Sequence, residues 1–182
     1  SAMGGSGPEL IYGPSDQVGP FATMGIIQPL DTLFEETFFN QFVENAVVHY
    51  QGHKWMVGDV VGNHLMLIYN KEMLSSPPKN TDELIRIGKE LTRDPDGDGK
   101  IDQYGLVWNF TEPFFYAPWL GGFGGWLMTE DNQPDLNTIE NQNGFTFIKS
   151  LQDEHKIIPK ECDYEIANAM FLNGTAAMII NG

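Results

Sequence analysis

The sequence has very little cysteine and few basic residues, and both shortages exclude classes of protein. Cys162 is the only cysteine among 182 residues, so an intrachain disulfide and a cysteine-based zinc site are both excluded. Lysine and arginine number 10 against 25 aspartates and glutamates, which gives a formal net charge of −15. Because nucleic acids need a basic face on their partner, we expect no interaction with nucleic acid.

Signatures of common catalytic and membrane-spanning segments are also missing. No apolar run reaches the roughly 18 residues that a membrane-spanning helix needs. The glycine-rich stretch at residues 121–125 lacks the Lys-Ser/Thr ending of a phosphate loop. The four histidines are scattered and form no recognisable triad with a serine or cysteine: His49, His53, His64 and His155.

Both ends of the sequence have unusual compositions. Residues 1–7 (SAMGGSG) resemble a cloning remnant followed by a flexible Gly/Ser linker. The sequence stops just after an apolar, strand-like run at residues 176–180, and domains seldom end on such a strand. We therefore expect residues 1–7 to be a cloning scar and linker, and the remainder to be an engineered fragment of a longer protein.

Apolar runs bounded by turn residues alternate with segments of helical periodicity. The first pattern predicts strands and the second predicts amphipathic helices, while Gln51-Gly52 predicts a hairpin turn. The predicted strands are residues 8–12, 65–69 (buried on both faces) and 176–180, the hairpin is 46–57, and the helices include 32–45, 81–91 with Thr81 as cap, 141–154 and 164–173. This alternation predicts an α/β protein with a mostly parallel sheet.

Residues 94–102 (DPDGDGKID) match the first nine positions of a calcium-binding loop. The candidate ligands are the side chains of Asp94, Asp96, Asp98 and Asp102 and the carbonyl of Lys100. The twelfth position holds Gly105 in place of the usual bidentate glutamate, and the alternative is an acidic turn without metal. We therefore expect at most a Ca²⁺ ion at residues 94–102 and no required cofactor.

Two carboxylates are candidates for binding a polar ligand. Glu112 lies among aromatic residues in NFTEPFFY, and sugars present both hydroxyl groups, which bind carboxylates, and C–H faces, which pack on rings. The alternative is a buried aromatic cluster with a solvated glutamate. Asp16 follows the predicted strand 8–12, at the kind of sheet edge where ligands bind, and its alternative role is an Asx turn or helix cap.

Several stretches then line up in order with one family. They are residues 8–16 (PELIYGPSD), 24–31 (MGIIQPLD), 67–73 (LIYNKEM), 77–84 (PPKNTDEL) and 169–182 (AMFLNGTAAMIING). Their order and spacing resemble the extracellular solute-binding proteins of sugar ABC importers, specifically those that bind maltose and maltodextrins. The resemblance covers residues 8–182.

The resemblance implies a set of ligand-binding residues. Asp16 falls on a hydroxyl-binding aspartate of the first lobe, beside a position where glutamine replaces the family's arginine. Asn63 falls on an acidic sugar-binding position at the hinge. Glu112 falls on the sugar-binding glutamate of the second lobe, and Phe114 and Phe115 fall on its stacking aromatics, with Phe114 in place of a tyrosine.

The resemblance also implies the architecture and the cellular setting. It implies a type II periplasmic-binding-protein-like fold, with two lobes joined by a strand hinge that close on sugar. Residues 8–62 would form part of lobe one, and residues 63–182 the hinge strand and most of lobe two. We expect a periplasmic or extracellular location, including a lipoprotein anchor, and the membrane subunits of an ABC transporter as partners. Strand edges left open in an incomplete lobe predict a homodimer.

These observations favour a binding protein for maltodextrin or a related oligosaccharide that carries out no catalysis. One alternative is a calcium-stabilised structural fragment with no sugar binding of its own. The other is a glycoside hydrolase, which would need a second carboxylate facing Glu112 across the scissile bond. The sequence marks no such partner.

Overall fold

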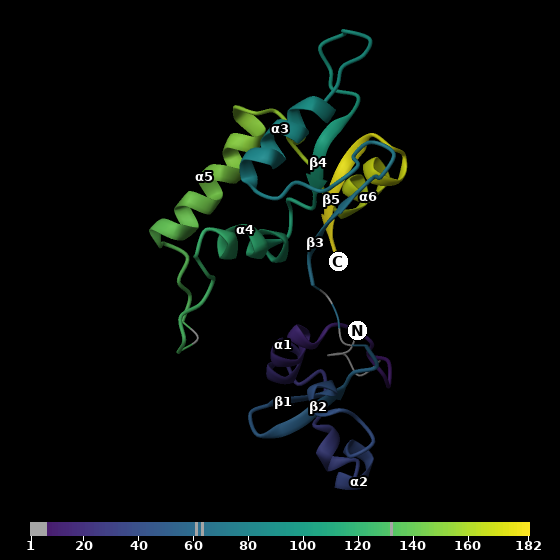
Figure 1. Ribbon diagram of the computed structural model, residues 1–182. Helices are drawn as coiled ribbons and strands as arrows, with labels where there is room; N and C mark the ends of the chain where they lie inside the picture. The colour runs from purple at the N-terminus through teal and green to yellow at the C-terminus, as the bar shows by residue number, and fades with distance from the viewer. Residues whose placement is uncertain (1–6, 61, 63, 132) are drawn as a thin grey trace. The chain divides into compact units, whose positions relative to one another are not determined.

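The computed structural model describes residues 7–60, 62, 64–131 and 133–182. The chain divides into two compact units, Ser1–Asn63 and His64–Gly182, whose elements are labelled in Figure 1. Within the described ranges, no helix is both long and apolar enough to cross a membrane. Each unit has its own secondary structure.

The first unit consists of short helices and one β-hairpin. Its elements are η2 (Ser15–Gln17), α1 (Val18–Thr23), η3 (Leu30–Thr32), α2 (Glu36–Phe39), η4 (Glu44–Ala46), β1 (Val47–Tyr50) and β2 (His53–Val57). β1 and β2 pair antiparallel, so the predicted hairpin is confirmed. Gln51 and Gly52 both have positive φ, at 49° and 80°, as the tight hairpin turn requires.

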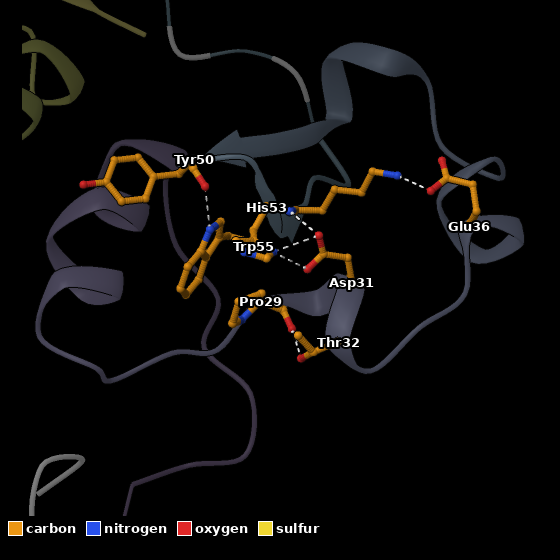
Figure 2. Close-up of polar contacts among 8 residues, drawn as sticks. Pro29, Asp31, Thr32, Glu36, Tyr50, His53 and Trp55 are labelled. Atoms are coloured by element: carbon orange, nitrogen blue, oxygen red, sulfur yellow. Dashed lines mark hydrogen bonds and ion pairs between the residues drawn. The ribbon is translucent and has the colours of Figure 1, made fainter.

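Polar side chains join the hairpin to the helices that precede it (Figure 2). Asp31 of η3 accepts a hydrogen bond from the backbone N–H of Lys54 at 3.3 Å and lies 3.2 Å from Nδ1 of His53. The Lys54 ammonium also pairs with Glu36 of α2. Desolvation acts to raise the pKa of Asp31, but its contacts with Lys54 and His53 outweigh this effect, and the pKa lies below its ordinary value. These contacts hold η3 and α2 against β2.

Two predicted elements of the first unit are wrong. Residues 8–12 are not a strand, because no described strand pairs with them, and Leu10 is 84% exposed. The predicted helix 32–45 is reduced to the four residues of α2. Phe, Thr and Asn are poor helix formers, and the phenylalanines pack on one another instead, with the Phe34 and Phe38 rings stacked at 4.3 Å.

The second unit is built on a three-stranded sheet with the order β3-β5-β4. Its strands are β3 (Met66–Tyr69), β4 (Tyr104–Trp108) and β5 (Ala176–Asn181). β5 pairs antiparallel with β3 and parallel with β4. The α/β class is confirmed, but parallel pairing does not predominate among the described strands. β3 lies at an edge with Met66 exposed, so the predicted burial of residues 65–69 on both faces is wrong.

Helices cover both faces of this sheet (Figure 1). Leu106 and Trp108 of β4 belong to a core formed with α3 (Thr81–Leu91) and α5 (Ile139–Asp153). Val107 points the other way, into a smaller core with Ala167 of α6 (Tyr164–Leu172). This alternation follows the two-residue period of a strand and buries β4 on both faces.

Side chains fix where the three long helices begin. The side chain of Asn80 accepts from the Glu83 N–H, that of Thr138 from Asn141, and that of Asp163 from Ile166, each at the start of its helix. Asn80 is therefore the cap of α3, and Thr81 is the first residue of the helix. The prediction that Thr81 is the cap is wrong. The predicted helices 81–91, 141–154 and 164–173 and the strand 176–180 are all confirmed, with shifts of one or two residues at some ends.

Two glycines let α3 and β4 pack backbone against backbone. A Cβ added to Gly105 would lie 2.5 Å from the Cα of Gly88, a separation that real structures do not tolerate. Thr92 fastens the contact, because its hydroxyl donates to the Gly88 carbonyl at 2.8 Å and accepts from the Gly105 N–H at 3.0 Å.

Candidate functional site

The segment that carries Glu112 begins where β4 ends. Pro113 opens the short 3₁₀ helix η5 (Pro113–Tyr116), because its fixed φ suits a first helical position, and α4 (Ala117–Gly122) follows directly. The Phe110 N–H donates to the Cys162 carbonyl at 2.7 Å, and the Tyr116 hydroxyl donates to the Phe110 carbonyl at 3.0 Å. Both backbone polar groups of Phe110 are therefore hydrogen-bonded, and these bonds fix the start of the turn.

Glu112 is exposed, and one of its carboxylate oxygens is already ordered by the protein. Oε1 accepts a hydrogen bond of 2.8 Å from the side-chain amide of Asn109. The ring of Phe114 is 40% exposed, whereas Phe115 is 5% exposed and lies in the core, edge-on to Phe114 at 5.6 Å. The turn thus exposes one carboxylate and the Phe114 ring to solvent, and the buried ring of Phe115 packs against the Phe114 ring.

An apolar cavity lies elsewhere in the same unit. It has a volume of about 210 Å³ and is lined by Leu65, Met66, Leu67, Pro118, Trp119 and Ile180. The Nε1 of Trp119 is buried without a hydrogen-bond partner among the described residues. Because its lining is apolar and does not include Glu112, this cavity is not part of the carboxylate site.

The other two predicted ligand-binding residues lie outside this turn. Asp16 is an exposed residue of η2 in the first unit, with Oδ1 3.5 Å from Nε2 of Gln17. Asn63 lies outside the described residues. The structure therefore brings together Glu112, Phe114 and Phe115 and places Asp16 in the other unit.

The acidic loop gathers three of its four predicted carboxylates. One oxygen each from Asp94, Asp96 and Asp102 lies within 4.8 Å of the others. Two oxygens bound to one Ca²⁺ ion at about 2.3–2.6 Å are separated by similar distances, so the three carboxylates suit this ion. Asp98 is not in this group, and its carboxylate lies 3.2 Å from the Lys100 ammonium.

Backbone N–H groups shape this loop, and its charges repel one another. Asp94 accepts from the Gly97 and Gly99 N–H groups at 2.8 and 3.0 Å. Desolvation, followed by the negative charges of Asp96, Asp94 and Asp98, raises the pKa of Asp102 above its ordinary value. The twelfth loop position is Gly105, and its packing against α3 leaves no room for the side chain of a twelfth ligand.

Comparison with known proteins decides the family. Over residues 1–182 the sequence matches the family described as bacterial extracellular solute-binding protein. The chain belongs to this family. The resemblance inferred from the sequence motifs is therefore confirmed: the relatives that the sequence pointed to are solute-binding proteins.

The relatives of this chain include proteins named for maltose and maltotriose. The maltose/maltodextrin-binding domain of Bdellovibrio bacteriovorus, solved bound to maltotriose, is 58% identical with a TM-score of 0.93 over 100% of this chain. The maltotriose-binding protein of Pyrococcus abyssi is 29% identical over 98% of this chain. The Thermus thermophilus maltotriose-binding protein, at 23% identity over 92% of this chain and a TM-score of 0.70, shares the fold.

This solute-binding chain is shorter than those relatives. It spans 38% of the length of the Pyrococcus protein, 48% of the Bdellovibrio chain and 45% of the Thermus chain. The binding-protein-like fold is therefore confirmed for the part of the relatives that this chain spans.

Sequence reasoning missed Asn109 as a residue of the site. The Thr111 N–H donates to its side-chain oxygen at 2.9 Å, and this contact from i+2 to i is the Asx turn that an asparagine after a strand often forms. That signal was available in the sequence. The hydrogen bond to Glu112 was not, because it depends on the turn that follows.

Proposed function

We propose that this chain is part of the solute receptor of a sugar ABC importer and binds maltodextrin-type oligosaccharides. The observation that carries the proposal is the 58% identity, over the whole chain, to a domain solved with maltotriose. The exposed carboxylate of Glu112 beside the exposed ring of Phe114 supports it, because a carboxylate accepts from sugar hydroxyls while a ring packs on sugar C–H faces. Titration calorimetry of the chain with maltotriose tests it. Heat that saturates at one sugar per chain supports the proposal, and no saturable heat contradicts it.

Replacing Glu112 with alanine is expected to weaken maltotriose binding by about 1–3 kcal/mol, the scale of a hydrogen bond to a charged group. The loss arises because the sugar hydroxyl that donates a hydrogen bond to Glu112 would no longer have a charged acceptor. Calorimetric titration of the variant measures it. Glu154→Ala, which removes an exposed glutamate at the end of α5, serves as the matched control and should bind as the unmodified chain does. An unchanged affinity in Glu112→Ala would refute the role of Glu112.

We infer that the chain binds sugar and does not cleave it. The family consists of solute-binding proteins, and glycoside hydrolysis needs two carboxylates facing each other across the bond. The partner that contacts Glu112 is an amide, Asn109. Release of reducing ends from maltodextrin by the purified chain would contradict this inference.

We propose a location outside the cytoplasmic membrane, in keeping with the extracellular family, either free in the periplasm or anchored as a lipoprotein. There the receptor would deliver its sugar to the membrane subunits of the importer. We also propose a homodimer that pairs exposed strand edges, because β3 has one unpaired side in the described sheet and its residue Met66 is exposed. Light scattering on a size-exclusion column distinguishes this dimer from a monomer.

Calcium binding at residues 94–102 remains our proposal for the acidic loop. An ion held by Asp94, Asp96 and Asp102 would relieve their mutual repulsion and bind the native state alone, so 1–10 mM calcium should raise the melting temperature relative to a chelator. Asp102→Asn should abolish this rise. Because the pKa of Asp102 is raised in the folded chain, its charge disfavours folding above that pKa, and the substitution should raise the melting temperature in chelator at pH 7. Equal melting temperatures in calcium and chelator would exclude the site.

A further inference from the structure

Asn109 is a buried polar residue at the edge of the carboxylate site. It follows β4 directly, lies between Trp108 and Phe110, and is 1% exposed. A buried amide must find hydrogen-bond partners, since leaving its polar atoms unpaired is costly. The contacts that Asn109 makes therefore indicate why an amide stands at this position.

Three hydrogen bonds fix the orientation of this amide. Its oxygen accepts from the Thr111 N–H at 2.9 Å and from the Thr111 hydroxyl at 2.7 Å. Its nitrogen donates to Oε1 of Glu112 at 2.8 Å. Rotating the amide by half a turn would set its N–H₂ against the Thr111 N–H and its oxygen against the carboxylate, which is unfavourable on both sides. The donor side of Asn109 must therefore face Glu112.

The hydrogen bond to Glu112 is not needed for the turn itself. An aspartate in place of Asn109 would accept both hydrogen bonds from Thr111 equally well, because aspartate also forms Asx turns. It would, however, place a carboxylate beside the carboxylate of Glu112. The contacts with Thr111 suit either asparagine or aspartate at position 109, whereas the contact with Glu112 suits only asparagine.

We propose that Asn109 is a positioning residue that holds the carboxylate of Glu112 ready for a ligand hydroxyl. An exposed glutamate otherwise samples several rotamers and must be ordered when the ligand binds. With Oε1 held by Asn109, the side chain is ordered beforehand, and the Oε2 atom is left to accept from the ligand. The ligand class in this inference, a maltodextrin hydroxyl, rests on the proposed function, whereas the ordering of Glu112 does not.

The decisive variant is Asn109→Asp, which keeps both acceptor contacts with Thr111, removes the donor and adds a negative charge beside Glu112. At pH 7 it should weaken maltotriose binding by about tenfold to a hundredfold, the range for losing a hydrogen bond to a charged group and adding a like charge. As the pH falls and the two carboxyl groups share a proton, the affinity relative to the unmodified chain should recover. If the loss came only from burying a charge in the turn, the same recovery at low pH would appear in the Glu112→Ala background, where the positioning role predicts little loss to recover.

Asn70→Asp is the matched control for the turn. Asn70 also accepts an N–H from two residues ahead, that of Glu72 at 2.9 Å, and no carboxylate accepts from its amide among the residues that the structure describes. Its affinity for maltotriose should match that of the unmodified chain at every pH. A loss equal to that of Asn109→Asp would overturn the proposal.

A double-mutant cycle separates positioning from general damage. In the Glu112→Ala background, Asn109→Asp should cause little further loss of affinity, because the group it positions is gone. Losses that add would mean that Asn109 acts independently of Glu112, and they would overturn the proposal.

A measurement without sugar keeps this test separate from the proposed function. Side-chain scalar couplings of Glu112, measured by NMR, should report one rotamer in the unmodified chain and averaging among several in Asn109→Asp, because the donor that holds Oε1 is gone. Equal couplings in the two chains would overturn the positioning role. If the unmodified chain bound no maltotriose while the couplings differed as expected, the proposed function would fail and the ordering of Glu112 by Asn109 would stand.

Discussion

Replacing Gly105 with alanine is expected to destabilise the second unit by about 3 kcal/mol or more, at the upper end of the cost of overpacking a core. The added methyl group would lie 2.5 Å from the Cα of Gly88 and 2.8 Å from its carbonyl carbon. These are backbone atoms in the middle of α3, so no side chain can rotate away, and the helix itself must shift. The shift would also break the hydrogen bonds of Thr92 to both glycines. Urea denaturation followed by circular dichroism measures the loss.

Gly122→Ala is the control for this prediction. Gly122 lies in the last turn of α4, and a Cβ added there would have no heavy atom within 4 Å. Alanine restricts the unfolded chain more than glycine does, so the variant should be unchanged or more stable by up to about 1 kcal/mol. If the two alanine variants unfolded at the same urea concentration, the close approach of α3 and β4 would be refuted.

Replacing Trp108 with alanine is expected to cost about 3–5 kcal/mol, the range measured for large aromatic residues in cores. Trp108 is fully buried, and its ring packs 4.4 Å from Phe110 and 5.1 Å from Trp119, measured between centroids. Its indole N–H has no partner among the described residues, so the loss arises from packing and from the cavity left behind. Since typical domains are stable by only about 5–15 kcal/mol, this single change removes much of that margin. Thermal unfolding and urea denaturation both measure it.

Trp126→Ala tests the same substitution at the surface. The side chain of Trp126 is 58% exposed, and it packs loosely near Gly121. Its removal should change the free energy of unfolding by about 0.5 kcal/mol or less. A loss comparable to that of Trp108→Ala would contradict the placement of the core beneath β4.

The elements that could be predicted from the sequence are those whose signals are local. The hairpin turn at Gln51-Gly52 needs positive φ at both residues, and α5 and α6 carry their own capping side chains. For residues 8–12, the predicted strand does not form, and the apolar run alone could not show this, because a strand depends on a partner elsewhere in the chain. For residues 32–45, helical spacing of the phenylalanines was a misleading signal, because they cluster with one another along a chain of poor helix formers.

In the candidate site, too, the residue types could be predicted from the sequence, whereas features that depend on packing could not. Glu112 and Phe114 could be predicted from residue types that suit a sugar, and the family resemblance pointed to the same residues. Whether a ring faces solvent depends on packing, and the sequence could not distinguish the exposed Phe114 from the buried Phe115. In the acidic loop, the spacing predicts four aspartate ligands; Asp94, Asp96 and Asp102 converge in the structure, and the Asp98 carboxylate lies beside the Lys100 ammonium. The motif gives the residue types but not where the neighbouring ammonium lies.

The middle position of β5 determines when the sheet of the second unit can form during synthesis. Synthesis delivers β3 and β4 long before β5, yet neither of the two earlier strands pairs with the other. Until β5 leaves the exit tunnel, both strands are apolar segments without a neighbour, and the ring closure that joins Met66 to Asn181 is among the longest in the chain. The second unit therefore completes its sheet only after β5 has been synthesised, and we expect β3 and β4 to be prone to aggregation until then.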